Sequence, residues 1–177
     1  MTLIEVITAQ SARLKQAGVS FGHGTGNAFD EAAWLVLWAL GLGLDALEDK
    51  AATVLTTEQQ AAAEALIGRR IETRVPAAYL TREAWLQNVP FYVDERVIVP
   101  RSYIAELLAD GEGTGTLDAW LSERTHKVLD LCTGNGSLAV IAAMAYPEVV
   151  VDAADISSDA LAVARINVDR HGMGRRI

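Results

Sequence analysis

A glycine-rich stretch between two apolar segments carries the residues with the clearest chemical potential. It reads Lys127-Val-Leu-Asp-Leu-Cys-Thr-Gly-Asn-Gly-Ser137, and Gly134 and Gly136 fall between a predicted strand and a predicted helix. Glycine at such a junction permits a tight turn and lets a ligand approach the backbone, while the start of the helix supplies free N–H groups. Asp155 ends the next apolar segment, where a carboxylate can accept both hydroxyl protons of a ribose. The pattern therefore predicts a site for a cofactor that contains a ribose.

Two cofactors fit this arrangement, and a turn with a purely structural role is the third possibility. Gly134-x-Gly136-x-x-Ala139 satisfies the dinucleotide pattern G-x-G-x-x-G/A, which favours NAD. Asp130, at the end of the first apolar segment, favours S-adenosylmethionine (SAM) instead. A buried carboxylate is costly unless it has partners. SAM brings an ammonium and a sulfonium to this place, whereas NAD brings a pyrophosphate that a carboxylate repels.

The elements that must position these residues alternate between strand and helix. We predict strands over Val128–Leu131 and Val149–Ala154, and helices over Ser137–Tyr146 and Asp159–His171. This order implies parallel strands with right-handed crossovers. The chain ends at Arg175-Arg-Ile177, where a third strand would begin. Because two parallel strands do not make a stable doubly wound sheet, we expect the sheet to be truncated.

The first part of the chain predicts helices. Helical spacing runs from Leu3 to Ala17, Asn27 is placed to cap a second helix, and Thr57 with Gln60 forms a capping box for a third. The β-rich segments 90–93 and 96–100 then predict a hairpin, followed by a short helix over Tyr103–Leu108.

Composition limits the possible partners and compartments. The 177 residues are 51% hydrophobic and carry a net charge of −8, which disfavours non-specific binding to nucleic acid phosphates. The single cysteine, Cys132, excludes an intrachain disulfide and favours a cytoplasmic protein. No apolar run reaches the roughly 20 residues of a membrane span, so no membrane partner is expected. The three histidines show no metal-ligand spacing, so we expect no metal site.

These motifs resemble a known enzyme family. Asp130-Leu-Cys-Thr-Gly-Asn-Gly136 and Asp155-Ile156 are similar to the first two SAM-binding motifs of class I methyltransferases. The wider pattern resembles the protein-(glutamine-N5) methyltransferases, and most of all the branch that modifies a glutamine of large-subunit ribosomal protein L-three. The segments that carry this wider resemblance are Phe21-Gly-His-Gly-Thr-Gly-Asn27, Asp30-Glu-Ala-Ala33, Arg74-Val-Pro-Ala-Ala-Tyr-Leu80 and Phe91-Tyr-Val-Asp-Glu-Arg-Val-Ile-Val-Pro-Arg101.

The resemblance implies an α/β protein in three parts. These are an N-terminal helical substrate-recognition domain (1–84), a β-hairpin linker (85–101), and the first part of a doubly wound, Rossmann-like SAM domain (102–177). It further implies that SAM is the cofactor, that Asp155 holds its ribose, and that a basic ribosomal protein is the substrate. The SAM-binding residues that it implies are Asp130, Cys132, Thr133, Gly134, Asn135, Gly136, Asp155 and Ile156.

Two departures from the family pattern bear on activity. Tyr103 stands where the family has proline, which alters a local turn. The Asn-Pro-Pro-Tyr motif that grips the substrate amide in the family is absent, so no catalytic residue is assigned and we expect weak activity or none. Two alternatives remain: the release-factor branch of the same family, and a fragment that binds a protein partner without catalysis.

Overall fold

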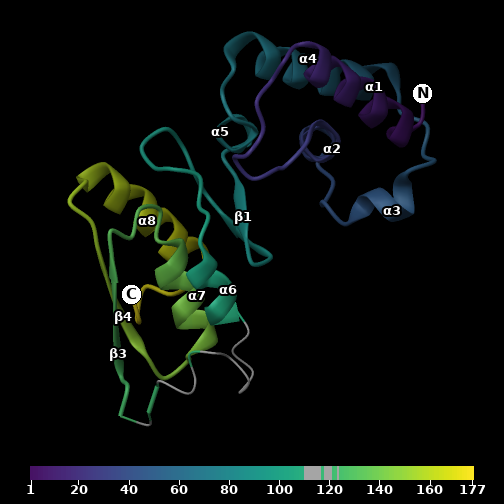
Figure 1. The fold of residues 1–177 in the computed structure, drawn as a ribbon. Helices are drawn as coiled ribbons and strands as arrows, with labels where there is room; N and C mark the ends of the chain where they lie inside the picture. The colour runs from purple at the N-terminus through teal and green to yellow at the C-terminus, as the bar shows by residue number, and fades with distance from the viewer. Residues whose placement is uncertain (110–116, 118–120, 123) are drawn as a thin grey trace. The chain divides into compact units, whose positions relative to one another are not determined.

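A computed structural model of the chain describes residues 1–109, 117, 121–122 and 124–177. Within it the chain divides into two compact units, Met1–Thr81 and Arg82–Ile177. The first unit is helical (Figure 1), with α1 (Leu3–Gln16), α2 (Ala28–Ala39), α3 (Ala46–Lys50), α4 (Thr57–Thr73) and α5 (Ala77–Thr81). The second contains β1 (Ala84–Leu86), β2 (Val89–Phe91), α6 (Tyr103–Ala109), β3 (Lys127–Leu131), α7 (Ser137–Ala145), β4 (Val150–Ala154) and α8 (Ser158–Arg170).

The first unit is a helical bundle whose core is made by α1, α2 and α4. Leu3, Ile7 and Leu14 of α1 are fully buried, as are Leu35 of α2 and Ile67 of α4. These positions follow the three-to-four-residue spacing that puts apolar side chains on one helix face. The prediction of a helical N-terminal region is therefore confirmed.

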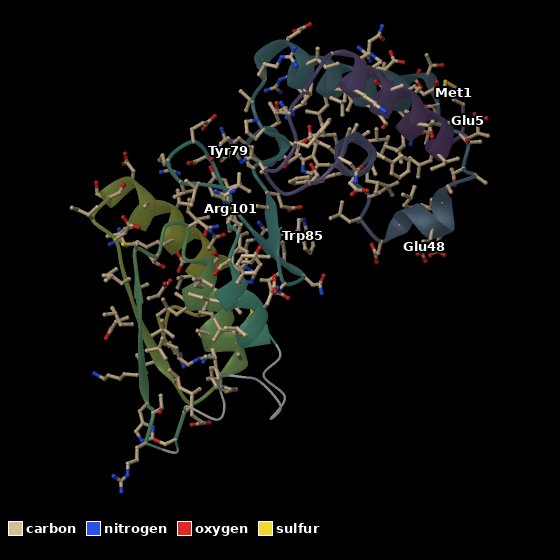
Figure 2. All side chains as sticks on the ribbon, in the orientation of Figure 1. Met1, Glu5, Glu48, Tyr79, Trp85 and Arg101 are labelled. Atoms are coloured by element: carbon tan, nitrogen blue, oxygen red, sulfur yellow. The ribbon has the colours of Figure 1, made fainter. Side chains whose placement is uncertain are left out.

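Side-chain caps define where these helices begin. Thr2 and Glu5 form a capping box at the start of α1, where Glu5 is visible in Figure 2. The side chain of Asn27 accepts from the N–H groups of Phe29 and Asp30, so the predicted cap of α2 is confirmed.

The capping box of α4 lies one residue before the predicted position. It pairs Thr56 with Gln59, and the predicted pair of Thr57 with Gln60 is wrong. The reason is that two threonines and two glutamines stand in tandem, so both registers satisfy the same motif.

A buried ion pair ties α2 to α4. The Arg70 Nε atom lies 2.7 Å from Oε1 of Glu31, and both side chains are almost completely buried. Thr25 donates to the other Glu31 oxygen, and Arg70 also donates to the carbonyl of Ser20. Because every charge here has protein partners, the network fastens the glycine-rich segment 22–26 to the bundle.

The linker does contain a hairpin, but its strands are not the predicted ones. β1 and β2 pair antiparallel through a turn at Gln87 and Asn88, which both have positive φ. The predicted hairpin of segments 90–93 and 96–100 is wrong. Asp94 instead closes a turn, since its side chain accepts from the Arg96 N–H and its carbonyl accepts from the Val97 N–H.

β3 and β4 form a parallel two-stranded sheet in the second unit. Their register pairs Asp130 with Ala153 and Leu131 with Ala154, so both strands end at the same edge. α7 connects them, and buried side chains of α7 and β4, such as Val140 and Val151, form the core. The structure confirms a mixed α/β fold with N-terminal helices and a small partial sheet of parallel strands, part of a Rossmann-like arrangement.

Candidate functional site: a glycine turn at the strand ends

The glycine-rich segment forms the turn between β3 and α7, at the edge where β3 and β4 both end. Cys132, Gly134 and Gly136 have positive φ values of 62°, 55° and 79°. The Thr133 N–H donates to the carbonyl of Ala154 at the end of β4, at 2.9 Å. This bond ties the turn to the neighbouring strand and places it at the carboxyl ends of the sheet, where open α/β sheets bind their ligands.

The two glycines of the turn face different surroundings. A Cβ atom added to Gly134 would meet nothing within 4 Å. A Cβ atom added to Gly136 would lie 3.1 Å from the Cβ and 3.2 Å from the Cα of Ala164 on α8. Gly136 is therefore required by packing, whereas the open side of Gly134 leaves the backbone accessible to a ligand.

Asp155, the residue after β4, closes against the turn. Its Oδ2 accepts from the Gly134 N–H and its Oδ1 from the Ser157 N–H, both at 2.9 Å. The N–H groups of Ser157 and then Gly134 hold the pKa of the Asp155 carboxyl below its usual range, so it is ionised near neutral pH. A carboxylate oxygen has two lone pairs, so each oxygen keeps the capacity to accept a hydroxyl proton.

Asp130 braces the turn from inside. Its Oδ2 accepts from the Thr133 hydroxyl at 2.5 Å and from the Ala139 N–H at 3.2 Å. The carboxylate therefore has the hydrogen-bond donors that a partly buried charge needs, and its charge lies at the end of β3.

The start of α7 has little spare capacity to bind phosphate. The Gly136 N–H donates to the carbonyl of Thr133, the Ser137 N–H to Oδ1 of Asn135, and the Ala139 N–H to Asp130. Phosphate sites at helix starts need such N–H groups to be free. This arrangement disfavours a pyrophosphate, and with it the dinucleotide interpretation of the glycines.

The eight residues expected to bind cofactor are brought together, but they differ in exposure. The Ile156 and Cys132 side chains are exposed, and Asp130, Gly134 and Asp155 are partly exposed. Thr133, Asn135 and Gly136 are buried within the turn. The accessible surface of the site is thus formed by Asp130, Cys132, Gly134, Asp155 and Ile156, and the three buried members lie behind it.

Two residues of α8 were not recognised from the sequence. Ala164 packs against Gly136, and Asn167 donates to the carbonyl of Asn135 at 2.8 Å. One signal was present: Ala160, Val163, Ala164 and Asn167 share one helix face, so an amide interrupts an otherwise apolar, buried stripe.

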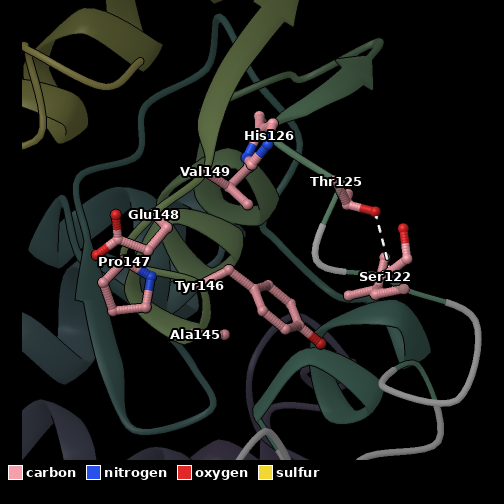
Figure 3. Close-up of a pocket in the computed structure, with 9 residues that line it drawn as sticks. Ser122, Thr125, His126, Ala145, Tyr146, Pro147, Glu148 and Val149 are labelled. Atoms are coloured by element: carbon pink, nitrogen blue, oxygen red, sulfur yellow. Dashed lines mark hydrogen bonds between the residues drawn. The ribbon is translucent and has the colours of Figure 1, made fainter.

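A hollow of about 490 Å³ lies at the other end of the strands. Figure 3 shows its lining, which includes His126 before β3, Val149 before β4, and Tyr146. Ligands of open α/β sheets bind beyond the carboxyl ends of the strands, and this hollow is at the amino ends. The glycine turn is therefore the stronger candidate site.

Within the described ranges, no group of three or more metal-ligating side chains gathers. Across the same residues, no helix has the length and apolar character needed to cross a membrane.

Comparison with known proteins agrees with this geometry. Residues 5–81 match the PrmC N-terminal domain family, and residues 110–177 match the Methyltransferase small domain family.

Three curated relatives are similar over nearly the whole chain, and each is named ribosomal protein uL3 glutamine methyltransferase. The one from Burkholderia pseudomallei is 52% identical over 99% of this chain and 56% of its own length. The one from Neisseria meningitidis serogroup B is 47% identical over 99% of this chain and 57% of its own length. The one from Bradyrhizobium diazoefficiens is 44% identical over 100% of this chain and 56% of its own length. The chain thus spans somewhat more than half the length of these relatives. The PrmC N-terminal domain match precedes the Methyltransferase small domain match along the chain, and over nearly its whole length the chain is similar to proteins named ribosomal protein uL3 glutamine methyltransferase.

Proposed function

We propose that this chain binds SAM at the glycine turn and contributes to N-methylation of a glutamine side chain in a ribosomal protein of the uL3 type. The observation that carries the proposal is the placement of Asp155 between the open side of Gly134 and the exposed side chain of Ile156. These groups offer a backbone, a carboxylate and an apolar surface on one edge of the sheet.

Each part of SAM has a complementary group there. Asp155 would hold the ribose, because its oxygens keep lone pairs that can accept hydroxyl protons. Ile156, whose side chain is exposed to water, would offer an apolar surface to the adenine. The open side of Gly134 and the exposed Cys132 would receive the methionine part.

Charge also favours SAM over a dinucleotide. SAM carries a sulfonium and an ammonium, and the site presents Asp130 and Asp155 at the ends of β3 and β4. The same carboxylates repel a pyrophosphate, for which the N–H groups of the α7 start are already engaged.

When bound, SAM supplies a methyl group activated by its sulfonium. An amide nitrogen is a weak nucleophile because its lone pair is delocalised into the carbonyl. The contribution of this chain would therefore be to position the cofactor through Asp155, Ile156 and the glycine turn. We assign no catalytic residue in this chain.

The substrate class follows from the relatives, which are named for ribosomal protein uL3. A basic ribosomal protein is also a suitable electrostatic partner for a chain with a net charge of −8. We propose that it acts in the cytoplasm, on the protein substrate directly, without binding nucleic acid or membrane. No specific observation favours a binding role without catalysis.

Calorimetric titration with SAM tests the cofactor site. Asp155→Ala removes the ribose acceptor, and Asp152→Ala is the matched control, because Asp152 is an exposed carboxylate in β4, three residues before Asp155. Charge-assisted hydrogen bonds contribute about 1.5–3 kcal/mol, so we expect Asp155→Ala to weaken SAM binding at least tenfold. Asp152→Ala should bind like the wild type. Equal binding by both variants would refute the assignment of Asp155.

A second experiment tests the substrate. We expect that a full-length homologue with these N-terminal residues transfers labelled methyl from SAM to ribosomal protein uL3. Transfer only to a peptide-chain release factor would refute the choice of branch, and transfer to neither would refute the proposed reaction.

A further inference from the structure

Asn167, in the middle of α8, is a fully buried amide whose hydrogen bonds join two distant segments. Its Nδ2 donates to the carbonyl of Asn135 at 2.8 Å and to the carbonyl of Tyr92 at 3.0 Å. Its Oδ1 accepts from the Tyr92 N–H at 2.7 Å. The side chain therefore pairs with both backbone groups of Tyr92 and uses its remaining proton on the glycine turn.

The bond to Asn135 acts on a single peptide group. The carbonyl of Asn135 and the N–H of Gly136 belong to the same rigid peptide plane. Asn167 holds the carbonyl, and the carbonyl of Thr133 accepts from the N–H at 2.9 Å. With both ends of the plane held, the peptide cannot rotate, although Gly136 alone would permit it.

Rotation of this peptide would disturb the accessible surface of the site. It would break the bond from the Gly136 N–H to Thr133, whose hydroxyl donates to Asp130. It would also leave a carbonyl of Asn135, itself 4% exposed, without a partner, which is costly in a buried place. Asn167 therefore stabilises one conformation of the turn over the alternative.

The other end of the Asn167 contact lies in a stiff part of the linker. Tyr92 donates its hydroxyl to Asp94, which also accepts from the Arg96 guanidinium at 2.6 Å. The Pro90 carbonyl contacts His171, one helical turn after Asn167, at 2.9 Å. The amide thus rests on a braced segment and gives the glycine turn a firm support.

We propose that Asn167 is a positioning residue for SAM binding: it holds the Asn135–Gly136 peptide in the orientation that the cofactor requires. The inference rests on the proposed function, since it names SAM as the ligand of the turn.

The test uses Asn167→Asp, which keeps an acceptor for the Tyr92 N–H but loses both donated bonds. Asn167→Ala removes the same bonds without adding a charge, in case a buried carboxylate prevents folding. The matched control is Val163→Ala, because Val163 is fully buried on the same face of α8 and makes only apolar contacts through its side chain. SAM affinity is measured by calorimetry and stability by urea unfolding. Amide hydrogen exchange at Gly136 and Ser137 is measured without SAM.

We expect Val163→Ala to reduce stability while its SAM affinity stays within twofold of the wild type. Amide exchange in the glycine turn should rise no more than exchange in α8. We expect either Asn167 variant to weaken SAM binding at least tenfold and to accelerate exchange at Gly136 and Ser137 selectively. Wild-type affinity in the Asn167 variants would overturn the inference, as would exchange in the turn that rises only as much as in Val163→Ala. If the wild-type chain binds no SAM, the proposed function fails, and the exchange data still decide whether Asn167 holds the turn.

Discussion

Substituting alanine for each glycine of the turn should show that Gly134 matters for ligand access and Gly136 for packing. Both residues have positive φ, 55° for Gly134 and 79° for Gly136, and a left-handed conformation costs an L residue about 1–2 kcal/mol. Gly134→Ala adds only this strain, because its new methyl group meets nothing within 4 Å. Gly136→Ala also forces the methyl group to 3.1–3.2 Å from Ala164, and overpacking adds about 1–3 kcal/mol. We therefore expect free energies of unfolding reduced by about 1–2 kcal/mol for Gly134→Ala and about 2–5 kcal/mol for Gly136→Ala.

Gly134→Ala should weaken SAM binding more than its small loss of stability would suggest. The methyl group of Gly134→Ala projects into the open space assigned to the ligand, so we expect at least tenfold weaker SAM binding with a modest loss of stability. Urea unfolding and calorimetric titration of the same preparations measure both quantities. The reasoning is refuted if Gly134→Ala binds SAM like the wild type, or if Gly134→Ala proves the less stable of the two.

Three further outcomes follow from the structure. Asn27→Ala removes the side-chain cap of α2 and should reduce the free energy of unfolding by about 1 kcal/mol in urea unfolding; no change would mean that the cap contributes nothing. Arg70→Met should cost about 3–5 kcal/mol, because it leaves Glu31 charged and buried, and the double variant with Glu31→Leu should recover most of that loss; a double variant as unstable as the single one would contradict this. The side chain of Arg96 holds the pKa of Asp94 well below its usual range, so the bond stabilises the fold above the unfolded pKa of about 3.9 and is lost as the pH falls towards the folded value. Melting temperatures of wild type and Asp94→Asn should therefore differ at pH 7 and approach each other below about pH 4; a difference independent of pH would exclude this cause.

The candidate site was predictable from the sequence because local rules determine it. Glycine is favoured where φ is positive, a strand and a helix flank the turn, and the acidic residue Asp155 follows the next strand. These features depend on neighbours in the chain, so the segment 130–136 and Asp155 were placed together correctly.

What could not be predicted depends on contacts between distant residues. The roles of Asn167 and Ala164 arise only when α8 packs on the turn, and no local rule connects them to Asn135 or Gly136. The same holds for the carbonyl of Asn135, whose hydrogen-bond partner Asn167 lies 32 residues further along the chain.

The linker shows how local rules can also mislead. The segment 96–100 has strand propensity. The side chain of Asp94, however, accepts hydrogen bonds from the Arg96 N–H and from the Arg96 side chain, and these bonds stabilise a turn in place of a paired strand. The observed hairpin turns at Gln87 and Asn88, a pair without the glycine that usually marks such turns.

Backbone amide NMR during titration with SAM tests most directly whether SAM binds at the carboxyl ends of β3 and β4. We predict the largest shifts at Gly134, Asp155 and Ile156, with little change at His126 and Val149 at the other end of the strands. Shifts concentrated at His126 and Val149, or none at the glycine turn under saturating SAM, would contradict it.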